Sequence, residues 1–151
     1  MSRPHGIYQV SLKVFLKNSA GQVLILKTPE EGSYQGFYDL PGGRIDADEF
    51  QLPFTEVLYR EIQEEVGGID CLIGDNPISL GRHFVPKGPL RDDDMHFLYV
   101  FFEGEYRGGD IQMSSEHTDY EWVDLKTVSL DDYFMSGILE GVRGYLGENK
   151  K

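Results

Sequence analysis

The sequence predicts an α/β protein in which a mixed β-sheet lies between helices. The chain has 151 residues, of which 40% are hydrophobic and 13% aromatic, a size and composition that suit a single globular domain over residues 1–151. Its segments with strand and helix patterns follow one another in the order strands, helix, strands, helix. This order is typical of a sheet that is covered by helices on its faces.

Three strand patterns precede the first helix, at residues 8–16, 23–26 and 37–40. Residues 8–16 alternate between apolar and polar side chains except at Phe15. The third pattern ends at Pro41. Gly42 and Gly43 follow, and because glycine lacks a side chain the backbone can turn sharply there and approach another group closely. We therefore expect this turn to be able to offer a bare carbonyl to a ligand.

The first helix is expected between Pro53, which suits a first helical turn, and the glycine pair that begins at Gly67. Its apolar residues recur every four positions, at Leu58, Ile62 and Val66. Such a stripe packs against a core.

The second half of the chain contains three further strand patterns, at residues 78–85, 95–102 and 120–123. Residues 95–102 are apolar almost throughout, which predicts a central, buried strand. Ser129 is expected to cap a final helix. The apolar stripe of this helix comprises Phe134, Ile138, Val142 and Leu146.

An acidic cluster occupies the other face of the first helix. Glu61, Glu64 and Glu65 are three and four residues apart, so a helix places all three carboxylates on one face. Like charges at this spacing repel each other by a few tenths of a kcal/mol per pair. The arrangement suits a cation that binds among them, and the alternative from the pattern alone is a solvated acidic face.

The region around this helix resembles the signature of the Nudix hydrolases. Gly43 is followed after five residues by Glu49, and a run of Arg, Glu, Ile, any residue, Glu, Glu, any residue and Gly occupies residues 60–67. Two features depart from the signature. Ten residues instead of seven separate Glu49 from Arg60, and Gly68 stands where an aliphatic residue is usual.

The resemblance implies a Nudix-type α/β/α sandwich and a metal-dependent pyrophosphohydrolase. Such an enzyme cleaves the diphosphate bond of a nucleoside diphosphate linked to another moiety, for example a nucleotide or a nucleotide sugar. The cofactor implied is Mg²⁺, with Mn²⁺ as an alternative. A non-catalytic nucleotide-binding module on the same fold is the main alternative, and a diphosphate-handling isomerase of the same superfamily is a third.

Site residues follow from the resemblance, one position at a time. The implied metal ligands are Glu61, Glu64, Glu65 and the Gly43 carbonyl. Arg60 is expected to orient Glu61 through a charge-assisted hydrogen bond, against the alternative of an ordinary surface arginine. Catalytic roles are expected for Arg60, Glu61, Glu64 and Glu116. The general base is left open between a helix glutamate and Glu116, which precedes the last strand.

Substrate contacts are less well marked in the sequence. Tyr34, Phe37 and Phe84 are candidates for stacking on a nucleobase, with core packing as the alternative. His83, His96 and His117 lack the spacing of metal ligands, so we expect structural roles for them, with contact to substrate as the alternative for His83 and His96. No feature of the sequence selects a particular nucleoside.

Charge and composition exclude several functions. The formal net charge is −12 and no basic patch is visible, which argues against a duplex nucleic acid as partner. No apolar run is long enough for a membrane span. Cys71 is the sole cysteine, so no internal disulfide forms and a cytoplasmic location is expected. The expected partner is a small-molecule diphosphate, and a homodimer is left open.

Overall fold

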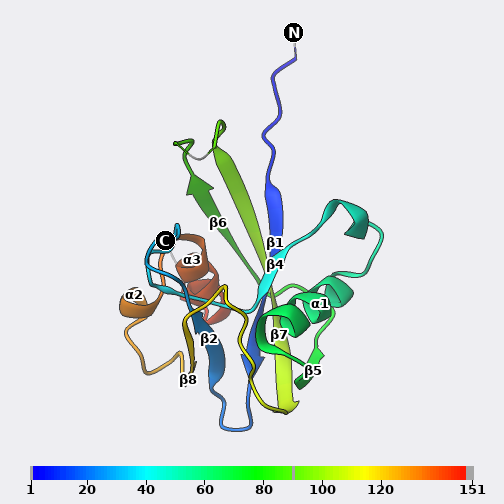
Figure 1. Ribbon diagram of the computed structural model, residues 1–151, viewed down its shortest axis with the longest axis vertical. Helices are drawn as coiled ribbons and strands as arrows, with labels where there is room; N and C mark the ends of the chain where they lie inside the picture. Colours follow the sequence, from blue (N-terminus) through cyan, green and yellow to red (C-terminus); the bar gives the residue numbers. More distant parts are fainter. Residues whose placement is uncertain (1, 90, 149–151) are drawn as a thin grey trace.

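The computed structural model describes residues 2–89 and 91–148 (Figure 1). Residue 1 and residues 149–151, at the ends of the predicted domain, lie outside this range. Within it, eight strands form one mixed sheet around two long parallel strands, β1 (Gln9–Lys17) and β7 (Met95–Gly108). These two strands pair along nine positions, from Gln9 opposite Phe97 to Lys17 opposite Glu105.

The remaining strands extend the sheet on both sides of this central pair. They are β2 (Val23–Lys27), β3 (Tyr38–Asp39), β4 (Gly42–Arg44), β5 (Asp70–Ile73), β6 (Ser79–Val85) and β8 (Asp119–Val123). The order along the main path is β3-β2-β1-β7-β5, while β4 pairs with β1, β6 with β7 and β8 with β2. The strands β5 and β6 both pair antiparallel to β7.

Two helices cover the opposite faces of the sheet, as Figure 1 shows for α1 (Phe54–Val66) and α3 (Ser136–Tyr145). Side chains of β1 alternate between the two faces. Leu12 and Val14 pack with α1, whereas Phe15 packs with α3. The predicted α/β/α sandwich with a mixed sheet is therefore confirmed. No helix among the described residues has the length and apolar character needed to cross a membrane.

The first helix agrees with its predicted limits. It follows directly after Pro53 and ends at Gly67, whose φ of 92° lies in the region that favours glycine. The apolar stripe is buried against the sheet. Just before it, a short 3₁₀ turn, η1 (Ala47–Glu49), brings Glu49 back toward α1.

The final helix differs from its prediction. It is divided into α2 (Leu130–Tyr133) and α3, because Phe134 and Met135 are extended. Ser129 precedes α2, but its side chain makes no capping hydrogen bond. The break lets the Phe134 ring enter the core, where it is 1% exposed. It also lets α3 lie close to the sheet, since a Cβ at Gly137 would stand 2.5 Å from the Arg82 carbonyl oxygen.

Three strands were also misjudged. The strand β4 occupies Gly42–Arg44, where a turn was predicted, because these residues pair with β1. The strand β5 was not predicted, because its four residues alternate too briefly for a clear pattern. The central strand β7 runs six residues beyond its predicted end at Phe102, to Gly108. Its extension is polar at Glu103 and Glu105 and is paired with β5, so tertiary pairing and not local apolarity fixes this end.

Candidate metal and catalytic site

The glycine pair that begins β4, Gly42 and Gly43, meets the acidic face of α1. The Gly42 N–H donates a hydrogen bond of 2.9 Å to Glu65 Oε1 in a buried position. At Gly43, a Cβ atom would lie 2.3 Å from Glu61 Oε1 and 2.6 Å from Oε2. The missing side chain of Gly43 is therefore what leaves room for the Glu61 carboxylate against the backbone of β4.

The three glutamates of α1 differ greatly in burial. Glu65 is 6% exposed, the Glu61 side chain 14% and the Glu64 side chain 60%. Burial raises the pKa of Glu65 to about 8, against the opposing effects of Lys13 and the Gly42 N–H. Burial also raises the pKa of Glu61, although the Arg60 guanidinium acts in the other direction. Two carboxyls of the cluster are thus held where an ionised group has little water around it.

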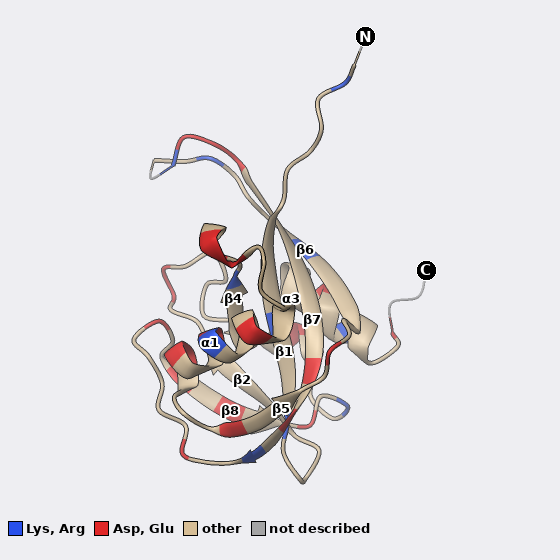
Figure 2. Cartoon of the chain, turned by 90° about the vertical axis from the view of Figure 1, so that its right-hand side faces the viewer, with Lys and Arg blue, Asp and Glu red and all other residues tan. Residues whose placement is uncertain are grey.

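Arg60 links the acids of this region. Its Nε and Nη2 atoms donate to the two oxygens of Glu49, at 2.5 and 2.6 Å. Its Nη1 atom lies 2.8 Å from Glu61 Oε2 and 3.2 Å from Glu64 Oε1. In Figure 2, acidic segments of α1 accordingly lie beside a basic segment of the same helix. One guanidinium therefore sets the relative positions of three carboxylates.

A buried ion pair lies behind the cluster on the sheet. Lys13 Nζ is 3.0 Å from Asp39 Oδ2, and the two side chains are 7% and 15% exposed. Burial alone lowers the pKa of Lys13, but the negative charges of Asp39 and Glu65 outweigh it, and the net shift is upward. The ammonium of Lys13 thus supplies positive charge beneath the acidic site.

A loop between β7 and β8 closes over the C-terminal end of α1. The Gln112 and Ser114 N–H groups donate to the last helical carbonyls, those of Val66 and Glu65, at 2.8 and 2.9 Å. These bonds bring Glu116 and His117 close to Glu65. One ligand atom from each of these three residues lies within 4.8 Å of the others.

His117 is a member of this cluster that the sequence did not reveal as functional. Its Nδ1 atom is buried and has no hydrogen-bond partner among the residues that the structure describes. Burial lowers the pKa of this imidazole. The lone signal in the sequence was its position next to Glu116, because no second histidine stands at a ligand spacing from it.

The three aromatic candidates lie in different surroundings. Tyr34 is 7% exposed; its ring stacks on His83 with a centroid distance of 4.6 Å and its hydroxyl donates to Tyr99 at 2.9 Å. Phe37 is half-buried in the loop before β3. Phe84 is 48% exposed and, since strand neighbours alternate, points away from the face on which His83 meets Tyr34.

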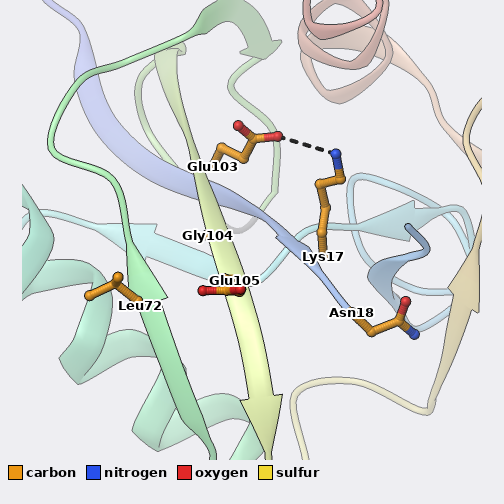
Figure 3. A pocket seen from close by; sticks show the side chains of 6 residues that line it. All are labelled: Lys17, Asn18, Leu72, Glu103, Gly104 and Glu105. Atoms are coloured by element: carbon orange, nitrogen blue, oxygen red, sulfur yellow. Dashed lines mark ion pairs between the residues drawn. The ribbon is translucent and has the colours of Figure 1, made fainter. Parts of the chain in front are cut away.

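A hollow of about 420 Å³ opens elsewhere on the sheet, near the ends of β1 and β7 (Figure 3). Its lining residues are Lys17, Asn18, Leu72, Glu103, Gly104 and Glu105. The Lys17 ammonium points to Glu103, 3.6 Å away. None of the predicted site residues lines this hollow. The predicted acids instead meet the glycine pair of β4, so the candidate site lies at α1 and β4.

The donors at α1 and β4 fit a divalent cation. Carboxylate oxygens are the ligands that Mg²⁺ and Mn²⁺ prefer. Glu61 and Glu65 provide them from one helical turn, and the cradle at Gly43 is just large enough for the Glu61 carboxylate. The positive charges of Arg60 and Lys13 limit the mutual repulsion of these acids.

Comparisons with known proteins identify the family of this chain. Residues 7–139 match the family model of the NUDIX domain. Nucleoside triphosphatase NudI of Escherichia coli O81 (strain ED1a) is 26% identical over 110 residues, which are 72% of this chain and 76% of that protein. The crystal structure of the MutT protein from Methanosarcina mazei Go1 has a TM-score of 0.71 at 26% identity and covers 95% of this chain and 96% of that one.

A further solved structure, the dihydroneopterin triphosphate pyrophosphohydrolase of E. coli, has a TM-score of 0.65 at 16% identity. It covers 93% of this chain and 97% of its own, and at this identity it supports the fold alone. The family match spans most of the chain and includes the acidic helix with its glycine turn. The chain therefore belongs to the Nudix family and is a Nudix-type hydrolase.

Proposed function

We propose that this enzyme cleaves the diphosphate bond of a nucleoside diphosphate linked to another moiety, with Mg²⁺ or Mn²⁺ as cofactor. The observation that carries the proposal is the convergence of Glu61 and Glu65, one helical turn apart, on the Gly42-Gly43 turn. A solvated acidic face would leave both carboxylates in water, whereas here both are largely buried. Their burial is costly unless a cation is bound.

The position of each residue in the site determines the role that we assign to it. Glu61 and Glu65 hold the cation, and Glu64 is the most exposed acid of the face. Arg60 is a positioning residue, because it fixes Glu61 and Glu64 through Nη1 while Glu49 fixes Arg60. A bound cation supplies neutralisation of the diphosphate and acidification of the attacking water. The proton of that water passes to a carboxylate of the same site, either Glu64 or Glu116.

Nucleoside triphosphates are the first substrate class to test. The relative from E. coli O81 is named a nucleoside triphosphatase. A triphosphate contains the diphosphate bond that the proposal requires. Nucleotide sugars and dinucleoside polyphosphates are the competing classes within the same reaction type.

The test is an activity panel with purified protein. Nucleoside triphosphates, dinucleoside polyphosphates and nucleotide sugars are incubated with Mg²⁺, with Mn²⁺ and with EDTA, and products are identified by ³¹P NMR. We expect cation-dependent cleavage of one class and none in EDTA. Absence of a product from every member would favour the nucleotide-binding module instead, because that module binds without cleavage.

Two variants and a control assign the site. We expect Glu61→Gln and Glu65→Gln to lose at least on the order of 10- to 100-fold in activity, the loss typical of groups that support a metal. Glu56→Gln is the matched control, because Glu56 is an exposed acid of the same helix. Near wild-type turnover in Glu65→Gln would show that the assignment is wrong.

A further inference from the structure

We propose that His117 provides an imidazole ligand which, with Glu65 and Glu116, binds a divalent cation and favours first-row transition ions such as Co²⁺ over Mg²⁺. The inference rests on the proposed function in one respect, since Glu65 belongs to both sites. It goes beyond that function in assigning a nitrogen ligand and a metal preference. It also makes Glu116 a ligand and leaves Glu64 as the proton acceptor.

The first support is geometric. The candidate ligand atoms of Glu65, Glu116 and His117 all lie within 4.8 Å of one another. Two ligands on opposite sides of an ion with bonds of 2.0–2.2 Å are roughly 4.2 Å apart. Neighbouring ligands of such an ion are roughly 3 Å apart, so the three side chains would have to draw closer by rotation, which the exposed position of Glu116 allows.

The second support is the unpaired nitrogen of His117. Its Nδ1 atom is inaccessible to solvent, and residues 2–89 and 91–148 offer it no hydrogen-bond partner. Buried polar atoms in proteins are nearly always paired, so an unpaired one calls for a specific reason. A buried ring nitrogen without a hydrogen-bond partner in the described chain, on an imidazole that lies beside two carboxylates, has the character of a metal ligand.

The third support is that backbone hydrogen bonds hold both ends of the segment that carries Glu116 and His117. Ser114 donates its N–H to the Glu65 carbonyl, and Thr118 donates its N–H to the Lys27 carbonyl, both at 2.9 Å. The segment between them is thus attached to α1 at one end and to β2 at the other. Ion binding then costs little ordering of the loop.

The metal preference follows from ligand chemistry. Mg²⁺ is a hard ion that prefers oxygen donors in a nearly ideal octahedron. Imidazole nitrogen suits the first-row transition ions, whose affinity rises from Mn²⁺ through Co²⁺ to Cu²⁺. A mixed set of two carboxylates and one imidazole therefore favours Co²⁺ over Mg²⁺ more strongly than carboxylates alone would.

The experiment measures binding directly, without substrate. Isothermal titration calorimetry with Co²⁺ alone and with Mg²⁺ alone is carried out on wild type, His117→Gln, Glu116→Gln and His5→Gln. We expect His117→Gln to lose on the order of 10-fold or more in Co²⁺ affinity. Its Mg²⁺ affinity should change little. His5→Gln is the control, since His5 is exposed in the N-terminal segment, far along the chain from the site.

A spectroscopic readout separates a ligand from a structural residue. In long-range ¹H–¹⁵N spectra, addition of Zn²⁺ should shift a ring nitrogen of His117 and leave the ring of His5 unchanged. Equal losses of Co²⁺ and Mg²⁺ affinity in His117→Gln, together with an unshifted ring nitrogen, would overturn the proposal. If Glu116→Gln keeps the Co²⁺ affinity of the wild type, the three-residue site is likewise refuted.

The two proposals can fail separately. If the protein cleaves a panel substrate but His117→Gln keeps the Co²⁺ affinity of the wild type, the inference is refuted and the proposed function is kept. Selective Co²⁺ binding through His117 without cleavage of any panel member would refute the proposed function and keep the inference about His117. Circular dichroism of each variant checks that the fold is retained, and Glu116→Gln tests the same site from a solvent-exposed residue if His117→Gln does not fold.

Discussion

Arg60 and Glu49 form a two-point ion pair in which Nε and Nη2 face the two carboxylate oxygens at 2.5 and 2.6 Å. The Glu49 carboxylate also accepts the Asp46 N–H at 2.9 Å. The hydrogen bond from Arg60 is the main reason why the pKa of Glu49 is lowered. The insertion that follows Glu49 is accommodated as a surface excursion, with Phe50 76% exposed, so the ion pair forms in spite of it.

Arg60→Lys should lower kcat on the order of 10- to 100-fold, because an ammonium cannot match the two oxygens of Glu49 and still hold Glu61. KM should change less, since Arg60 acts through the acids and not on the substrate. Steady-state kinetics give the two values separately. Arg107→Lys is the control, because Arg107 pairs with the exposed Glu105. An unchanged kcat in Arg60→Lys would show that the two-point contact between Arg60 and Glu49 has no part in catalysis.

Gly43→Ala should weaken divalent-cation binding while leaving the fold intact. The added Cβ meets the carboxylate of Glu61, which is the mobile end of a side chain and can move away. We therefore expect a stability change within about 1 kcal/mol, together with loss of cation affinity measured by calorimetry. Gly6→Ala provides the comparison, since a Cβ there meets nothing within 4 Å. Wild-type cation affinity in Gly43→Ala would argue against Glu61 as a ligand.

Lys13→Met should destabilise the protein by roughly 3–5 kcal/mol, because it leaves Asp39 without its buried partner. Lys17→Met is the matched control on the same strand: its partner Glu103 is 45% exposed, so the loss there should be below about 1 kcal/mol. Urea denaturation measures both values. Similar urea midpoints for Lys13→Met and Lys17→Met would mean that the Lys13–Asp39 pair contributes no more to the free energy of unfolding than a surface ion pair.

Features that follow from local sequence periodicity could be predicted, whereas features that depend on contacts between distant segments could not. The acidic face and the apolar stripe of α1 could be predicted because helical periodicity fixes both. The contact between Gly43 and Glu61 could not, since it requires β4 to pair with β1 beside the helix. His117 reaches Glu65 through backbone hydrogen bonds to the helix end, and backbone bonds of that kind leave no residue pattern.

The break at Phe134 shows the same limit in the fold. The apolar spacing from Phe134 to Leu146 is compatible with one continuous helix, and the local sequence offers no proline to interrupt it. The break is instead set by the sheet, on which Gly137 and Gly141 allow α3 to approach closely. A tertiary contact thus decides a boundary that local propensity leaves open.

His83 of β6 contacts the start of α3 and the loop before β3. Its Nδ1 lies 2.7 Å from Ser136 Oγ and its Nε2 3.4 Å from Ser33 Oγ, while Tyr34 stacks on the ring. Burial lowers the pKa of His83, although the charge of Asp39 acts in the opposite direction. Below the ordinary histidine pKa of about 6.5, the unfolded chain therefore binds a proton that the folded state resists. The contribution of His83 is complete above that pH and is lost as the pH falls through its lower folded value. Free energies of unfolding measured by urea between pH 5 and pH 8 should consequently fall toward acid more steeply in wild type than in His83→Gln. Parallel curves for the two proteins would show that this imidazole is protonated equally well in both states.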